Sequence, residues 1–169
     1  MSLVPFKALP PESRLFIFPA AGQLRSDAIA KATPMIEAFL GQWKVHQQDP
    51  IVGYQIRHER FLLVGVDEST IPPSGCSIDA LTRFMKELGS SLGMEWLDGP
   101  EVLYRDSAGV QGATRAQFAT LATQGEVDAG TIVFNNTIQR LGELETSWEI
   151  AASDSWHGRV FRLKEAAAA

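Results

Sequence analysis

The chain has 169 residues, of which 45% are hydrophobic and 21% are charged, and its formal net charge is −5. This size and composition are ordinary for one globular domain, with or without a small appendage, and they exclude an intrinsically disordered chain. The sequence pI of about 5.2 argues against broad binding to nucleic acid or to an anionic membrane, because both need a basic surface.

The cysteine count and the apolar segments bear on the compartment. The single cysteine, Cys76, cannot form an internal disulfide, so nothing in the sequence requires an oxidising compartment. The first residues lack the pattern of a signal peptide, and no segment approaches the roughly 20 apolar residues that cross a bilayer. We therefore expect a cytoplasmic protein that binds neither membrane nor nucleic acid.

The N-terminal part of the chain predicts a surface tail, a strand and a helix. Residues 1–12 are rich in proline and are expected to lie along the surface. The short apolar run Leu15–Phe18 is typical of a buried strand. Between Leu24 and Trp43 the apolar residues recur every three or four positions, which indicates one helical face, and Pro34 predicts a kink or the start of a second helix.

Two strands, a helix and a further strand follow. Ile51–Arg57 and Arg60–Val66 are both predicted to be strands, and the second is apolar almost throughout, which predicts a central position covered on both faces. The segment from Ser77 to Leu92 has a helical apolar stripe, with Ser77 as its expected N-cap. Val102–Tyr104 then predicts another strand.

The order of these elements indicates the fold class. Strand, helix, strand, strand, helix, strand is the order of the ferredoxin-like fold, an antiparallel βαββαβ sheet with two helices on one face. We therefore predict an α+β protein with a ferredoxin-like core at residues 13–106. Such sheets often pair edge to edge, so this fold would allow a homodimer.

The C-terminal part is predicted to be a small α/β extension, residues 107–163, packed on that core and followed by a disordered tail, residues 164–169. Within it, Thr114 and Gln117 have the spacing of a capping box and predict a short helix. Thr131–Phe134 predicts a strand, and residues 137–145 predict a weak helix or a further strand. These patterns fit both a separate small domain and an extension of the same sheet.

The stretch from Asp67 to Asp79 combines carboxylates, a rigid turn and the start of a helix. Backbone N–H groups at a helix N-terminus bind phosphate or carboxylate, and Arg57, Arg60 or Arg105 could supply the opposing positive charge. We therefore predict an anion or small-ligand site here, with ordinary helix capping as the alternative explanation. The ligand-binding residues predicted in this part of the site are Asp67, Glu68, Ser74, Gly75, Ser77 and Arg105.

Asp67 and Glu68 end a strand close in sequence to Asp79, so these carboxylates could hold a divalent cation or act as acid and base. Acidic residues also end strands and begin helices because both places are solvated. The spacing matches no diagnostic metal-binding motif, and we predict no metal site.

Cys76 is a candidate nucleophile. Amides at a helix N-terminus stabilise a thiolate, and His157 or His58, both distant in sequence, could act as the base with Asp79 or Asp67 orienting it. The alternative is a small buried cysteine packed under the helix start, since cysteine is among the most buried residue types. The predicted catalytic residues are Cys76, His157 and Asp79.

Two further segments carry candidate ligand-binding side chains. Ser155-Trp156-His157 could stack on and hydrogen-bond a ligand, or the tryptophan could anchor the C-terminal segment to the core through its large area. Asn135-Asn136 is most often turn chemistry, although paired amides could recognise a polar ligand. We include Asn135, Asn136 and Trp156 in the predicted site.

Five segments together resemble a family of small uncharacterised bacterial proteins, over roughly Leu15 to Phe161. The segments are Val66-Asp67-Glu68, Ser74–Asp79, Tyr104-Arg105-Asp106, Val133–Asn136 and Ser155-Trp156-His157. Members of this family are sometimes labelled "ABC transporter ATPase". The resemblance implies positions for motifs, but it implies no mechanism and no cofactor.

The residues do not support an ATPase. Phe61–Glu68 is similar to a Walker B strand, but a phosphate-binding loop also needs Gly-Lys followed by Ser or Thr. None of the five lysines follows a glycine, so the chain lacks the cradle for the β- and γ-phosphates. We predict that the protein is not an ATPase.

The sequence therefore predicts a small cytoplasmic binding or regulatory protein, with an anion or small-ligand site at the Asp67–Asp79 turn. The alternative is an enzyme with Cys76 as nucleophile and His157 as base, which requires both side chains within hydrogen-bond reach and open to a pocket. A third class, a structural interaction module, predicts a large exposed apolar patch instead.

Overall fold

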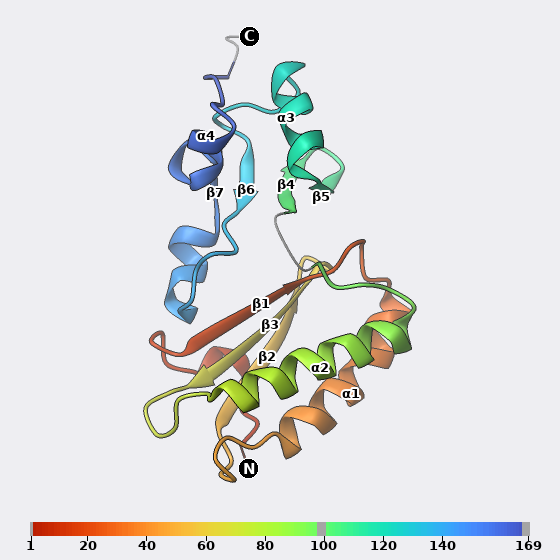
Figure 1. The fold of residues 1–169 in the computed structure, drawn as a ribbon, viewed down its shortest axis with the longest axis vertical. Coiled ribbons are helices and arrows are strands. Elements are labelled where there is room, and N and C mark those ends of the chain that lie inside the picture. Colours follow the sequence, from red (N-terminus) through yellow and green to blue (C-terminus); the bar gives the residue numbers. More distant parts are fainter. Residues whose placement is uncertain (1, 98–100, 167–169) are drawn as a thin grey trace. The chain divides into compact units, whose positions relative to one another are not determined.

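The computed structural model describes residues 2–97 and 101–166 and shows a mixed α+β protein (Figure 1). The chain divides into two compact units. Unit 1 comprises Met1–Leu97 with Gln139–Gly142, and unit 2 comprises Asp98–Ile138 with Glu143–Ala169. Each unit contains one antiparallel sheet, so the predicted α+β class is confirmed.

The sheet of unit 1 has three strands in the order β1-β3-β2. They are β1 (Arg14–Pro19), β2 (Ile51–Arg57) and β3 (Phe61–Asp67), and β3 pairs antiparallel with both neighbours. Every residue of β3 from Phe61 to Val66 is buried. This confirms the central position that its apolar run predicts, because a strand covered on both faces needs apolar side chains on both.

Helices α1 (Ser26–Gln42) and α2 (Gly75–Leu92) lie together on one face of this sheet (Figure 1). Their apolar stripes form a core with the even-numbered residues of β3, and Phe39 of α1 stacks on Phe84 of α2 with ring centroids 4.2 Å apart. Pro34 lies inside a continuous α1, so it does not start a second helix. The helical spacing of the sequence thus correctly identified both helices.

The N-terminal segment, which the sequence predicted to be a surface tail, pairs with the outer edge of β2 and covers the opposite face of the sheet. The N–H of Val4 donates to the carbonyl of Val52 at 2.8 Å, and the N–H of Val52 donates to the carbonyl of Ser2 at 2.8 Å. A Cβ at Gly65 would lie 2.6 Å from Leu9 Cδ1, so this glycine makes room for the segment. Residues 2–12 are therefore part of unit 1, which corrects that prediction.

The predicted fourth strand is not in this sheet. At the edge of β1 opposite β3, the N–H of Leu97 donates to the carbonyl of Pro19 at 2.7 Å, and the N–H of Leu15 donates to the carbonyl of Gln139 at 2.9 Å. Two short segments therefore lie where a ferredoxin-like sheet has its fourth strand. The structure retains three strands and two helices of the predicted core, and the described residues do not confirm the complete four-stranded topology.

The segment predicted as that strand, β4 (Val102–Asp106), belongs to the sheet of unit 2. It forms a hairpin with β5 (Gly109–Ala113) through a turn of two residues, in which Asp106 Oδ1 accepts from the N–H of Ala108 at 2.8 Å. Closing so short a loop costs little conformational entropy, which favours this local partner over a distant strand. The unit boundary at Leu97 thus replaces the predicted core boundary at residue 106, which would divide the hairpin.

The sheet of unit 2 has the order β5-β4-β6-β7, with β6 at Ile132–Phe134 and β7 at Glu149–Ala151. Helix α3 (Arg115–Thr123) packs on one face through Phe118, which is fully buried against Val102 and Val133. The predicted capping box of α3 and the predicted strand at β6 are both confirmed.

The remainder of unit 2 consists of short helical turns. Leu141–Glu143, at the junction of the two units, and Ala152–Asp154 are 3-10 turns, Leu144–Trp148 is a π-helical turn, and α4 spans Trp156–Val160. The carbonyl of Lys164, in the predicted tail, accepts from the N–H of Ala129 at 2.7 Å, whereas residues 167–169 lie outside the described residues. No helix in the described part of the chain has the length and hydropathy needed to span a membrane.

Candidate functional site

The turn before α2 is a closed network of capping hydrogen bonds. Ser74, and not Ser77 as predicted, is the N-cap, and its Oγ accepts from the N–H of Ser77 at 3.2 Å. Ser77 Oγ accepts in return from the N–H of Ser74 at 2.8 Å and lies 2.8 Å from the carbonyl of Ser74, to which it donates. The carbonyl of Ser77 accepts from Trp43 Nε1 at 2.9 Å. The polar groups of both serines therefore have partners inside the turn and the core.

The two carboxylates at the end of β3 are also engaged locally. Asp67 Oδ1 accepts from the N–H of Ser69 at 2.9 Å and stabilises the turn that leaves the strand. Glu68 Oε2 forms an ion pair with Arg140 at 2.7 Å, in which the Glu68 side chain is 25% exposed. Both carboxylates therefore have partners within the protein, Asp67 in the turn and Glu68 in the ion pair.

Three residues at the start of α2 are open to solvent. Gly75, Cys76 and Asp79 are all exposed, and nothing lies within 4 Å of the position that a Cβ on Gly75 would take. Cys76 is therefore not the buried core cysteine that was one alternative. Among the described residues no group of three or more His, Cys, Asp or Glu side chains could hold a metal ion.

His157 is 1% exposed and lies in the interior of unit 2. Ser155 Oγ is 2.8 Å from His157 Nδ1, accepts from the His157 N–H at 3.1 Å and donates to the carbonyl of Ala152 at 3.1 Å. When that hydroxyl donates to Ala152, Nδ1 is the protonated nitrogen of the neutral ring and donates to Oγ. Burial, together with the positive charge of Arg115, lowers the pKa of His157 to about 4.

Trp156 adds a stacked aromatic arrangement around His157. The two rings stack with centroids 3.7 Å apart, and the guanidinium of Arg115 lies 5.3 Å from the centroid of the Trp156 ring. Trp156 Nε1 is buried and has no hydrogen-bond partner in the described part of the chain. This cluster keeps the histidine neutral, because a protonated ring would be buried beside a cation.

Arg105, Asn135 and Asn136 have structural partners in unit 2. Arg105 forms an ion pair with Glu149 at 2.8 Å and lies over the ring of Phe134. Asn135 Oδ1 accepts from the N–H of Thr137 at 3.3 Å, which is the turn chemistry expected of asparagine. Asn136 Oδ1 accepts from Nε1 of the fully buried Trp148 at 2.8 Å.

The predicted residues thus form two groups. Asp67, Glu68 and the 74–79 turn lie in unit 1, while Arg105, Asn135, Asn136, Trp156 and His157 lie in unit 2. Cys76 belongs to unit 1 and His157 belongs to unit 2, so they are not part of one site within either unit. The His157 side chain is buried inside unit 2.

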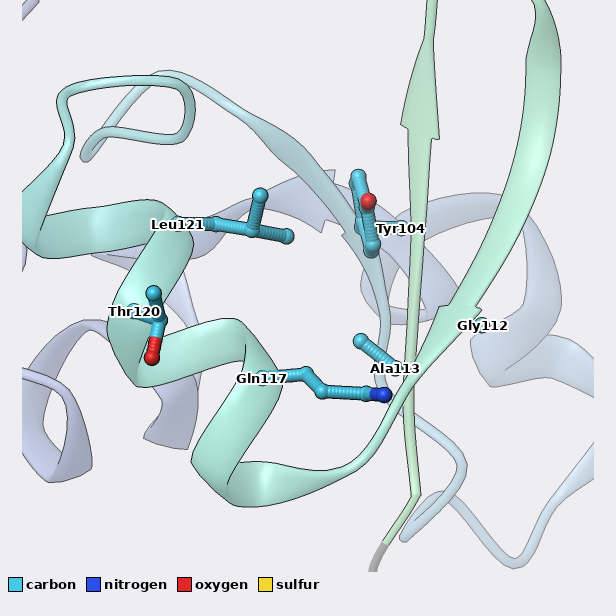
Figure 2. A pocket seen from close by; sticks show the side chains of 6 residues that line it. All are labelled: Tyr104, Gly112, Ala113, Gln117, Thr120 and Leu121. Carbon is cyan, nitrogen blue, oxygen red and sulfur yellow. The ribbon is translucent and has the colours of Figure 1, made fainter.

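Unit 2 contains an open pocket that the sequence did not predict (Figure 2). It has a volume of about 430 Å³ and lies between the β4–β5 hairpin and α3, and its lining residues are Tyr104, Gly112, Ala113, Gln117, Thr120 and Leu121. Figure 2 shows Gln117 and Leu121 extending from α3 toward the strands. In this region the sequence predicted a helix from the Thr114–Gln117 capping box and a strand that includes Tyr104. Neither pattern indicated a cavity.

The pocket lining is uncharged but has hydrogen-bonding groups. Gln117 Oε1 accepts from the N–H of Thr114 at 2.9 Å, which closes the cap and leaves the amide nitrogen directed toward Ala113 (Figure 2). Thr120 Oγ1 donates to the carbonyl of Ala116 at 3.1 Å, so its lone pairs can still accept. Burial, together with the negative charges of Asp106 and Glu126, raises the pKa of Tyr104, so this phenol is neutral and can donate.

Comparisons with known proteins add no assignment: no protein-family model, no curated protein and no solved structure matches this chain. The resemblance seen in the sequence segments therefore stays a prediction.

Proposed function

We propose that the protein is a small-ligand-binding or regulatory protein and that the pocket of unit 2 is its binding site. The observation that carries this proposal is the pocket itself, an open hollow of about 430 Å³ whose lining combines apolar side chains with the polar groups of Tyr104, Gln117 and Thr120. Pockets of this size and lining are the usual sites for small ligands in proteins.

Two further observations favour binding over the other classes. The candidate nucleophile Cys76 and the candidate base His157 lie in different units, and His157 is buried with Nδ1 next to Ser155 Oγ. The large hydrophobic residues that are exposed in the described chain are Ile51 and Val160, one in each unit. Single exposed residues of this kind are ordinary and do not make the large apolar patch of an interaction module.

The experiment is a titration of the whole chain with three aromatic probes of similar size, phenethylammonium, phenethyl alcohol and hydrocinnamate, followed through the methyl NMR signals of Leu121 and Ala113. We expect saturable shifts from at least one probe, because both methyl groups line the pocket. Thr120→Trp should abolish them by filling the pocket mouth. Thr123→Trp is the matched control, because Thr123 is exposed on the same helix and donates to the carbonyl of Ala119 at 3.0 Å. Unchanged methyl signals with all three probes would contradict the proposal.

The start of α2 is a second candidate site, now limited to a small anion. Gly75 and Cys76 are exposed in the first turn of an 18-residue helix, where the N–H groups and the helix dipole favour negative charge. The test is a titration with inorganic phosphate that follows the amide signals of Gly75 and Cys76. A response that is no larger than at the start of α3 would remove this candidate.

Two finer expectations from the sequence are also proposals. We propose a cytoplasmic location, because the lone cysteine is exposed and requires no oxidising compartment. We propose that two copies associate through the outer edge of β2 beyond Val52, since Val52 itself is paired with the N-terminal segment. Sedimentation equilibrium tests this, and a monomer at all concentrations would exclude the dimer.

A further inference from the structure

The charge around the pocket of unit 2 indicates which ligands it can take. None of the six lining residues is charged, and the walls combine the ring of Tyr104 with the apolar side chains of Ala113 and Leu121. The pocket therefore offers apolar contact and an aromatic ring, and any electrostatic preference must come from side chains at its margin.

Two carboxylates stand at that margin. Asp106 is two residues from Tyr104 on β4 and therefore on the same face of the sheet, and its Oδ1 lies 3.3 Å from Nε2 of Gln111, the cross-strand partner of Tyr104. The backbone of Glu126 is held at the end of α3, because its N–H donates to the carbonyl of the lining residue Leu121 at 2.9 Å, and its side chain is exposed. Both carboxylates act on the Tyr104 phenol, whose pKa they raise after burial.

The basic residues of the same elements are directed elsewhere. The elements β4, β5 and α3 contain two basic residues, Arg105 and Arg115. Arg105 is adjacent to Tyr104 and so lies on the opposite face of the sheet, where it pairs with Glu149 at 2.8 Å. The guanidinium of Arg115 lies over the ring of Trp156. Within these three elements, the charged side chain on the pocket face of the sheet is therefore that of Asp106.

We propose that the pocket of unit 2 binds a small organic cation with an apolar body, such as an aralkyl or alkyl ammonium ion. The apolar body would contact Leu121 and Ala113, and the positive group would lie near the Tyr104 ring and the carboxylates of Asp106 and Glu126. An ammonium over an aromatic face is attracted by the ring quadrupole, and carboxylates at the margin add a longer-range attraction. This inference rests on the proposed function, because it needs the pocket to be a binding site.

The same three probes test the charge preference. At low ionic strength we expect phenethylammonium to bind about fivefold or more tighter than phenethyl alcohol, and hydrocinnamate to bind most weakly. The preference should shrink toward unity at about 0.5 M salt, because exposed charges are then screened within a few ångströms. Asp106→Asn and Glu126→Gln should each weaken the cation by about two- to threefold and leave the alcohol unchanged.

The variants keep the surrounding structure and have a matched control. Asn at position 106 retains the oxygen that accepts from the N–H of Ala108 at 2.8 Å. Glu87→Gln removes one negative charge from an exposed position in the middle of α2 and should leave the affinity for all three probes unchanged. If all three probes fail to bind, the proposed function itself is wrong. If the alcohol or hydrocinnamate binds as tightly as the cation, the pocket remains a binding site and the cation inference is overturned.

Discussion

Helices α2 and α3 begin with the same motif, a reciprocal capping box, yet the two boxes differ in what they leave for a ligand. In α2 the partners are Ser74 and Ser77, and the Ser77 hydroxyl both accepts from and donates to Ser74. In α3 the partners are Thr114 and Gln117, and the longer side chain closes the box with its oxygen alone. The Gln117 amide nitrogen is then directed into a pocket, whereas the Ser77 side chain is buried.

The two helix starts therefore differ in the side-chain groups that the cap leaves unused, and at α2 only the backbone N–H groups of the first turn remain for a ligand. A serine at the third helical position can satisfy the cap and nothing else, because its single oxygen is used in both directions. A glutamine carries a second polar atom that extends beyond the helix end. The size of the residue at this capping position therefore decides whether its side chain can also contribute to a ligand site.

The largest expected effect concerns the scaffold of the pocket. Phe118 is fully buried beneath α3, with its ring centroid 5.4 Å from that of Tyr104 and 4.8 Å from that of Phe161. Phe118→Ala should lower the free energy of unfolding by about 3–5 kcal/mol, because it removes buried area and leaves a cavity. Urea unfolding measures this. Phe161→Ala is the control, since Phe161 is only half-buried, and an equal cost for the two variants would contradict the packing described.

The next effect is a pH dependence that comes from His157. Its folded pKa of about 4 lies below the ordinary value of 6.5, so the unfolded chain takes up the proton first as the pH falls. The neutral ring therefore contributes fully to the free energy of unfolding above about pH 6.5. This free energy falls by roughly 3 kcal/mol as the pH is lowered toward 4.

Urea unfolding between pH 7 and pH 4 tests this for the wild type and for His157→Gln. The difference in stability between the two proteins should change by that amount across the range, because the carboxylates titrate in both. His46→Gln is the control, since His46 is exposed. If the assigned ring signal of His157 itself titrates near pH 6.5, His157 is not buried as described.

A smaller effect distinguishes the two capping boxes. Ser74→Ala and Thr114→Ala should each lower the free energy of unfolding by about 1 kcal/mol, because each leaves an N–H of the first helical turn without its side-chain acceptor. Gln117→Ala should alter probe binding at the pocket, whereas Ser77→Ala should not. Loss of probe binding in the Ser77 variant would mean that the comparison between the two helix starts is wrong.

The smallest expected effect concerns the enzyme hypothesis. Cys76 is exposed at the start of α2, so its thiol should be alkylated in the native protein without unfolding. His157→Gln should change this rate by less than about twofold, because the histidine is buried in the other unit beside Ser155. Stopped-flow alkylation measures both rates. A large loss of reactivity in the variant would restore the Cys-His nucleophile.

The sequence by itself determined the local elements of both units. The apolar run at β3 gave a central strand, the helical spacing gave α1 and α2, and the Thr114–Gln117 pair gave the capping box of α3. These features depend on side-chain periodicity and on hydrogen bonds within a few residues. Within one helix or strand, this periodicity already determines which apolar side chains lie on the same face.

Only the tertiary structure decided which elements pair and what the polar residues face. Val102–Asp106 could extend the first sheet or form a hairpin with Gly109–Ala113, and strand pattern alone does not distinguish these partners. The burial of His157 depends on long-range packing, because the ring lies beside Phe118 of α3. The pocket around Tyr104 depends on the hairpin and on how α3 packs against it. Long-range pairing depends on small differences between large opposing energies, so short motifs cannot determine it.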